Sequence, residues 1–140
     1  TVKEKSQAKS YDVNVIIESG PMIMKISKVF LDPAYKHDTY YDPINAVVFD
    51  VTIENTSSES VSWYPGGEIV TNTKEQIRGR TFDQINGEYK GKVIKKGKYF
   101  YEVEGDVSQI KSINFFVDSA YDSKTYEDFG EEQSIEIILE

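Results

Sequence analysis

The stretch Ala46–Pro65 reads AVVFDVTIENTSSESVSWYP. Its first half alternates, and one face of an extended chain would collect Val47, Phe49, Val51 and Ile53. Because the side chains of a strand point alternately to its two faces, this half predicts a strand with one buried face and one partly solvated face. The polar run Asn55–Ser60 favours a reversal, and alternation resumes at Val61 and Trp63. We expect Trp63 to lie over the apolar face of the first strand or in the core beyond it.

Similar alternation along the rest of the chain predicts further strands. We expect them at Tyr11–Ile17, Met22–Leu31, Glu68–Asn72, Tyr99–Val103, Ile113–Val117 and Ile135–Leu139. Turn residues occur at Ser19–Pro21, Asn86-Gly87 and Lys95–Lys98, while the interval Phe82–Tyr89 fits helical spacing as well as a loop. About seven or eight short strands without a long amphipathic helix predict an all-β antiparallel β-sandwich or barrel.

The alternation changes phase once inside the second of these strands. Apolar side chains occupy even positions from Met22 to Ile26, whereas Val29 and Leu31 are at odd positions. A one-residue β-bulge near Lys28 would return both sets to the same face. We therefore expect a bulged strand.

Size and charge exclude several classes of partner. The 140 residues suffice for one domain, which at this size buries about 70% of the surface of its unfolded chain. The 16 basic and 24 acidic side chains leave a net charge of -8, which disfavours nucleic acid and anionic membranes. The basic stretch Lys90–Lys98 is predicted to be a solvated hairpin edge. No apolar run approaches the roughly 20 residues that span a bilayer, so no transmembrane segment is expected.

Reactive side chains are scarce. The chain has no cysteine and one histidine, His37. Disulfides, thiol nucleophiles and cysteine-based metal sites are therefore excluded, and a Ser-His-Asp triad would need His37 as its base. The sequence contains no nucleophile elbow, phosphate-binding loop or dinucleotide-binding fingerprint. We expect a protein that is not an enzyme.

Two long segments without sustained periodicity are predicted to be loops, Asp32–Asn45 (DPAYKHDTYYDPIN) and Asp118–Gln133 (DSAYDSKTYEDFGEEQ). Long loops often carry function, and exposed tyrosine rings stack on sugars or pack against protein partners. The candidate binding residues are the loop tyrosines Tyr35, Tyr40, Tyr41, Tyr121 and Tyr126. The alternative is that the tyrosines of the first loop lie on the sandwich and close one end of its core.

The same loops are rich in carboxylates, which are preferred ligands of calcium. The candidate ligands are Asp32, Asp38 and Asp42 in the first loop, and Asp118, Asp122, Glu127 and Asp128 in the second. Neither set has the fixed ligand spacing of an EF-hand, and a solvated acidic face is the alternative. No cofactor other than calcium is expected.

The first ten residues, Thr1–Ser10 (TVKEKSQAKS), are nearly free of apolar side chains. Such a segment buries too little surface to offset the entropy cost of ordering, so we expect a flexible linker or tail. The remaining residues, 11–140, are expected to form one domain.

The order of these patterns resembles a known family. The matching residues are Val47–Asn55 with the polar turn Thr56–Ser60, and Lys96-Gly97 ahead of Tyr99–Val103. They resemble the immunoglobulin-like domains of secreted proteins and surface lipoproteins of Gram-positive bacteria. That family is largely without assigned function and is similar in fold to a secreted mycobacterial immunogenic protein. The resemblance spans about Tyr11 to Glu140, although no cysteine pair brackets the tryptophan and the turn Lys-Lys-Gly-Lys lacks the family's proline.

The resemblance implies an immunoglobulin-like sandwich and an extracellular or membrane-anchored location at the surface of a Gram-positive cell. It also implies that Thr1–Ser10 is the spacer after a lipid-modified cysteine, with a lipid anchor upstream of residue 1. Our first hypothesis is a non-enzymatic lipoprotein module that binds a protein or a cell-wall component through its loops. The alternative is a small-ligand or calcium-binding protein whose two acidic, tyrosine-rich loops converge at one end of the sandwich.

Overall fold

The computed structural model describes residues 7–139, in which β-strands are the main regular structure. The strands are β1 (Lys9–Ser19), β2 (Met22–Tyr35), β3 (Ile44–Asn55), β4 (Ser60–Trp63), β5 (Glu68–Thr71), β6 (Gln76–Arg78), β7 (Gly87–Lys90), β8 (Ile94–Glu102), β9 (Ser112–Val117), β10 (Tyr121–Asp122) and β11 (Gln133–Ile138). A short 3-10 helix, η1 (Val107–Gln109), precedes β9. No helix in this part of the chain has the length and apolar character needed to cross a bilayer. The all-β prediction is confirmed.

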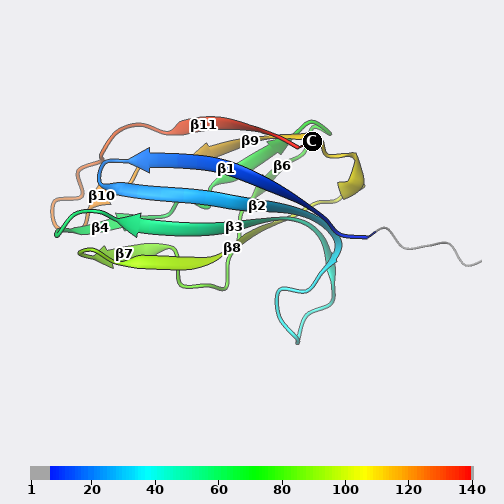
Figure 1. Cartoon of the computed structure of the whole chain (residues 1–140), viewed down its shortest axis with the longest axis horizontal. Coiled ribbons are helices and arrows are strands. Elements are labelled where there is room, and N and C mark those ends of the chain that lie inside the picture. The colour runs from blue at the N-terminus through cyan, green and yellow to red at the C-terminus, as the bar shows by residue number, and fades with distance from the viewer. Residues whose placement is uncertain (1–6, 140) are drawn as a thin grey trace, which may run out of the picture.

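The strands form three antiparallel sheets. We name them after one member each: the β3 sheet has the order β1-β2-β3-β8, the β4 sheet β10-β4-β7, and the β5 sheet β11-β9-β5-β6. In Figure 1 the β3 sheet lies in front, and strands of the other two sheets, such as β9, lie behind it. Buried side chains of all three sheets belong to one core cluster.

Aromatic rings join the sheets across this core. Phe49 of β3 packs with ring centroids 5.1 Å from Tyr101 of β8 and 5.2 Å from Phe115 of β9. Trp63 is 0% exposed and donates its indole N–H to the backbone oxygen of Asp118 at 2.7 Å. Trp63 therefore lies in the core, as the sequence predicts, with its one polar atom satisfied.

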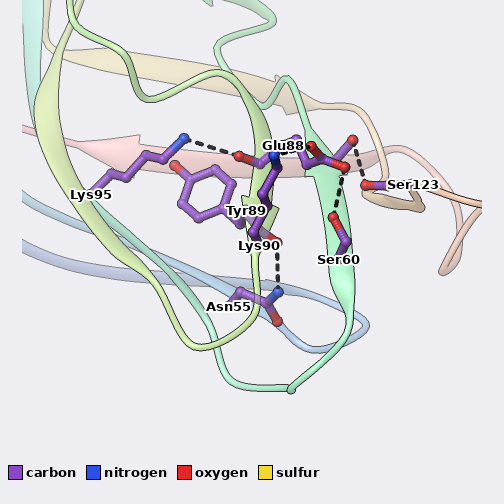
Figure 2. Close-up of polar contacts among 8 residues, drawn as sticks. Asn55, Ser60, Glu88, Tyr89, Lys90, Lys95 and Ser123 are labelled. Carbon is purple, nitrogen blue, oxygen red and sulfur yellow. Dashed lines mark hydrogen bonds and ion pairs between the residues drawn. The ribbon is translucent and has the colours of Figure 1, made fainter.

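The reversal after β3 is an arch between sheets instead of a hairpin. Strand β3 pairs with β2 and β8, whereas β4 pairs with β7 and β10. Figure 2 shows the amide of Asn55 pointing toward β7, where it donates to the backbone oxygen of Tyr89 at 3.1 Å. The same amide donates to the oxygen of Glu59 at 2.7 Å and accepts from the N–H of Ser57 at 2.9 Å. A buried asparagine thus ties the end of the β3 sheet to the β4 sheet.

The predicted bulge in β2 is confirmed. The register of β2 against β3 shifts between Ile26 and Lys28, which leaves Ser27 without a partner on β3. Val29 and Leu31 then return to the buried face, with exposed fractions of 0% and 2%. The extra residue thus lets one long strand keep a single apolar face.

The turn predicted at 95–98 is wrong. Lys95 and Gly97 lie inside β8 and pair with Ile53 and Val51 of β3, so the basic stretch leads from one sheet to another and is no hairpin. The glycine serves a close approach: a Cβ atom on Gly97 would lie 2.6 Å from Cβ of Asp83. In this strand the lysines extend into solvent or over aromatic rings, as Lys95 does over Tyr89 at 4.2 Å.

Several predicted boundaries also change, because strand pairing extends further than side-chain alternation indicates. Lys9 and Ser10 already pair with β2, so the predicted tail is too long; residues 1–6 lie outside the described part. The first predicted loop shortens to residues 36–43, since Asp32 and Tyr35 belong to β2 and Asn45 to β3. The interval 82–86 is a loop, and β6 lies where no strand is predicted. Strand β10 and the start of β11 fall in the second predicted loop. Eleven strands therefore replace the expected seven or eight within the described residues.

Replacing the arch asparagine should be strongly destabilising. In Asn55→Ala the buried backbone oxygen of Tyr89 and the backbone oxygen of Glu59 each lose a donor, and the N–H of Ser57 loses its acceptor. We therefore expect the free energy of unfolding to fall by about 2–4 kcal/mol. Urea unfolding measures the change. The exposed Asn114 of β9 supplies the control, because Asn114→Ala should change the free energy of unfolding by less than about 0.5 kcal/mol. Equal effects of the two substitutions would contradict the role of Asn55.

Three core tyrosines should make stability fall at alkaline pH. Burial raises the pKa of Tyr89, Tyr99 and Tyr101 in the folded state. A folded-state pKa above the unfolded value of about 10 contributes stability that is complete below pH 10 and is lost as the pH rises further. The urea midpoint should therefore be lower at pH 11 than at pH 9. Phenolate absorbance supplies the check, because folded protein should ionise fewer tyrosines at pH 11 than urea-unfolded protein.

Candidate functional site

The clearest candidate surface lies on the outer face of the β3 sheet, away from the main core. In β8 the rings of Tyr99 and Tyr101 face the core, so Phe100 between them points to the opposite face. Phe100 is nevertheless only 2% exposed and packs with Ala46 and Val48 of β3 in a second, smaller cluster. An apolar residue on an outer face is buried only when another segment covers it.

The loop 36–43 and the segment 79–86 provide that cover. The imidazole of His37 lies parallel to the Phe100 ring, with centroids 4.7 Å apart and an angle of 7° between the planes. The His37 ring also lies 4.9 Å from the ring of Phe82 and 4.7 Å from that of Tyr41, while Tyr35 lies 5.7 Å from Phe100. We call the five rings of Tyr35, His37, Tyr41, Phe82 and Phe100 the aromatic platform.

The platform combines buried and exposed rings. Phe82 is 55% exposed and Tyr41 is 51% exposed, although their rings pack against each other. Tyr40 beside them is 93% exposed. Aromatic side chains held on a buried base and left open to solvent are typical of contact surfaces.

Charged groups surround the rings. The guanidinium of Arg80 lies 5.3 Å from the centroid of Phe100, and Lys98 forms an ion pair with Asp50. Asp83 accepts the backbone N–H of Lys98 at 2.7 Å, and a depression of about 270 Å³ lies between these residues and the rings. Burial, with the charges of Asp83 and Asp50, raises the pKa of Tyr35. Side chains of both charges therefore lie around the aromatic platform.

The five predicted tyrosines divide between two places. Tyr35 and Tyr41 belong to the platform and Tyr40 lies next to it, while Tyr121 and Tyr126 pack together with centroids 6.2 Å apart. The loop 36–43 is the cyan loop at the lower right of Figure 1, and the orange segment that contains Tyr121 and Tyr126 lies at the left. The expectation that the two loops converge at one end is therefore wrong. The first loop joins the end of β2 to the start of β3. The second lies between β9 and β11 and packs Phe129 against Gly20, in the turn that precedes β2.

Sequence reasoning did not assign His37, Phe82 and Phe100 to a binding surface. One signal was available for Phe100, which is apolar but out of phase with its buried neighbours Tyr99 and Tyr101. No comparable local signal exists for Phe82, because only the tertiary fold brings its loop onto the sheet.

The predicted calcium ligands are spread over the chain. Asp32 and Asp38 each accept a nearby backbone N–H, from Ala34 at 2.9 Å and from Tyr40 at 3.0 Å. Asp122 accepts the N–H groups of Lys124 and Thr125, and these bonds lower its pKa. Across residues 7–139 no three His, Asp or Glu side chains are grouped so that they could hold a metal ion, with Asp42, Asp118, Glu127 and Asp128 included in that range. The carboxylates of Asp32, Asp38 and Asp122 stabilise the local backbone.

Comparisons with known proteins identify structures of similar fold but do not assign a function. No family model matches the chain, and no curated protein matches its sequence. A conserved hypothetical protein from Bacillus anthracis superposes with a TM-score of 0.59 at 13% identity, over 91% of this chain and 100% of that one. A functionally unknown protein from Listeria monocytogenes superposes with a TM-score of 0.60 at 8% identity, over 96% of this chain and 86% of that one. These likenesses show a shared fold.

A third neighbour is the "putative lipoprotein (ycdA)" from Bacillus subtilis. It superposes with a TM-score of 0.56 at 11% identity, over 91% of this chain. The present chain spans only 39% of that protein, so the likeness concerns one part of it.

Calcium should leave the stability of the protein unchanged. The carboxylates of Asp38 and Asp122 already accept backbone donors, and within residues 7–139 neither belongs to a group of three side chains that could hold a metal ion. A ligand raises the melting temperature only if it binds the native state, so melts with and without millimolar CaCl₂ should coincide. Magnesium at the same ionic strength is the control. A rise in melting temperature with calcium alone would contradict this reading of the two loops.

Proposed function

We propose that the protein is a non-enzymatic interaction module displayed at the surface of a Gram-positive cell, and that its aromatic platform contacts a protein partner. The three antiparallel sheets around one core support an immunoglobulin-like sandwich as its scaffold. The likeness to part of the Bacillus subtilis protein supports a lipoprotein context. The observation that carries the proposal is the group of exposed rings, on Tyr40, Tyr41 and Phe82, gathered at one end of the outer face of the β3 sheet.

The platform has the composition of a protein-binding hot spot. Tyrosine, phenylalanine and arginine are enriched at the centres of protein interfaces, and here the guanidinium of Arg80 lies over the base of the ring cluster. A partner would bury Tyr40, Tyr41 and Phe82. Tyr41 and Phe82 would lose little conformational freedom on binding, because their rings already pack on His37. The surface is therefore largely prepared before contact.

The environment of the single histidine supports a non-catalytic role. The ring of His37 packs against Phe82 and Phe100, and its Nδ1 atom is buried without a hydrogen-bond partner in the described residues. A general base is oriented by a hydrogen bond from one ring nitrogen to a carboxylate or carbonyl. The Nδ1 atom of His37 makes no such bond within residues 7–139, and the ring acts as part of the aromatic surface.

Removing the exposed rings should abolish binding to cells. Labelled protein is titrated onto intact Gram-positive cells, before and after the cells are treated with protease, and bound label is measured by flow cytometry. In the variant Tyr40→Ala, Tyr41→Ala and Phe82→Ala we expect Kd to rise by at least about a hundredfold, the sum of several hot-spot losses. Protease treatment of the cells should have the same effect on the wild-type protein.

The matched control is Tyr126→Ala, which removes a ring that is 74% exposed at the opposite end of the molecule. This variant should bind as the wild type does. Unchanged binding of the platform variant would refute the platform as the contact surface. Binding that survives protease treatment would refute a protein as the partner.

A further inference from the structure

A second surface feature lies on the other side of the molecule and is independent of the platform. It is a groove of about 630 Å³ on the outer face of the β5 sheet. Its floor includes Glu68 of β5, Arg78 of β6 and Phe116 of β9, which form one row across adjacent strands. We propose that this groove is a binding site for an uncharged oligosaccharide.

The groove is built where four strands begin or end at the same edge of the sheet. Strand β5 begins at Glu68, β6 ends at Arg78, β9 ends at Val117 and β11 begins at Gln133. The residues just outside those ends, including Tyr64, Asp118 and Glu132, stand around the floor. A volume of this size lies within the usual range of small-molecule sites.

Close backbone packing fixes the shape of the floor. A Cβ atom on Gly67 would lie 2.0 Å from the backbone oxygen of Phe116, so the link between β4 and β5 lies directly against β9. Gly79 donates its N–H to the oxygen of Gly67 at 2.8 Å. The buried Tyr101 donates its hydroxyl to the oxygen of Gly66 at 2.9 Å. The floor is thus held by the core before any ligand arrives, which lowers the entropy cost of binding.

The lining has the chemistry that hydroxyl-rich rings require. Tyr64 is 54% exposed and Phe116 is half-buried, so both offer aromatic surface to the apolar face of a sugar ring. Around them stand planar polar groups of both kinds. Arg78 and Gln76 are donors, and Asp118 and Glu132 are acceptors. Because each sugar hydroxyl both donates and accepts, this mixture can satisfy it from two sides.

Hydrogen bonds within the groove position its polar side chains and leave some of their donors free for a ligand. Glu68 accepts from Gln76 at 2.5 Å and lies 3.5 Å from the guanidinium of Arg78, which orders all three side chains. The side chain of Arg78 remains 83% exposed, so most of its five donors face solvent. Asn86 accepts the hydroxyl of the core residue Tyr99 through its amide oxygen, which directs its amide nitrogen outward.

The charge of the groove argues against acidic ligands. Glu68, Asp118 and Glu132 face a single guanidinium, so the groove is net negative on a protein that is itself at -8. Phosphate- or uronate-bearing polymers would be repelled, whereas an uncharged chain would bind through hydrogen bonds and ring contacts. This selects neutral sugars among the glycans.

Amide chemical shifts in ¹⁵N-labelled protein test the proposal. The probes are hexasaccharides of glucose, of mannose and of N-acetylglucosamine at millimolar concentration, with hexagalacturonate as the acidic comparison. We expect at least one neutral hexamer to shift the amides of Glu68, Val70, Arg78 and Phe116, and hexagalacturonate to leave them unshifted. No shift of these amides with any neutral hexamer would overturn the proposal, as would equal shifts with the acidic one.

Variants separate the groove from the rest of the protein. Tyr64→Ala removes an exposed ring, and Asp118→Asn keeps the backbone oxygen that accepts from Trp63. Each should raise Kd for the bound hexamer about tenfold or more while the spectrum stays that of folded protein. Tyr40→Ala, which alters only an exposed ring beside the platform, should bind the hexamer unchanged. Wild-type affinity in both groove variants would refute the site even if a sugar binds elsewhere, and this result does not depend on whether the platform binds a protein.

Discussion

The rest of the structure depends on β3 being paired on both edges along most of its length. Residues Ala46–Asn55 of β3 pair with β2, and residues Ala46–Glu54 pair with β8, so most of its backbone donors and acceptors are satisfied inside the sheet. Because the backbone of β3 needs no contact with water, both faces of the strand can carry buried apolar side chains. The inner face gives Val47 and Phe49 to the main core, and the outer face gives Val48 to the cluster around Phe100. Each fully buried side chain of this kind contributes about 1.5–3 kcal/mol.

The two ends of β3 determine what lies beside the sheet. At its last residue, Asn55, the chain leaves for another sheet, and the buried amide supplies the hydrogen bonds that a hairpin would have provided. At its first residue, Ile44, the preceding loop 36–43 folds back over the outer face, because Phe100 and Val48 would otherwise expose apolar surface there. The covering loop brings its own aromatic rings. The aromatic platform is therefore a consequence of apolar residues on the outer face of a sheet whose inner face already forms the core.

The sequence predicts those features that depend on local alternation. The inward faces of β3, β8 and β9, the burial of Trp63 and the bulge at Ser27 all follow from the parity of neighbouring residues. Features that depend on distant segments could not be predicted in this way. Lys-Lys-Gly-Lys has the composition of a turn, and only the long ladder with β3 and the approach of Asp83 show why Gly97 lies in a strand. Two of the rings that pack on His37, Phe82 and Phe100, lie 45 and 63 residues away in the chain, counted from 37 to 82 and from 37 to 100, which no local pattern reveals.

One segment, residues 78–86, links the edge of the β3 sheet to both surfaces. Strand β8 is an edge strand, and exposed edges invite pairing with other chains. Arg80 exchanges two backbone hydrogen bonds with Phe100 at 2.9 Å, and the carboxylate of Asp83 takes the N–H of Lys98, so part of this edge is closed within the chain. In doing so the segment presents Phe82 to the platform on one side and Arg78 with Asn86 to the groove on the other. The same nine residues thus protect an edge strand and contribute to both proposed binding surfaces. Their hydrogen bonds to β8 hold this segment in place, although it has few apolar residues.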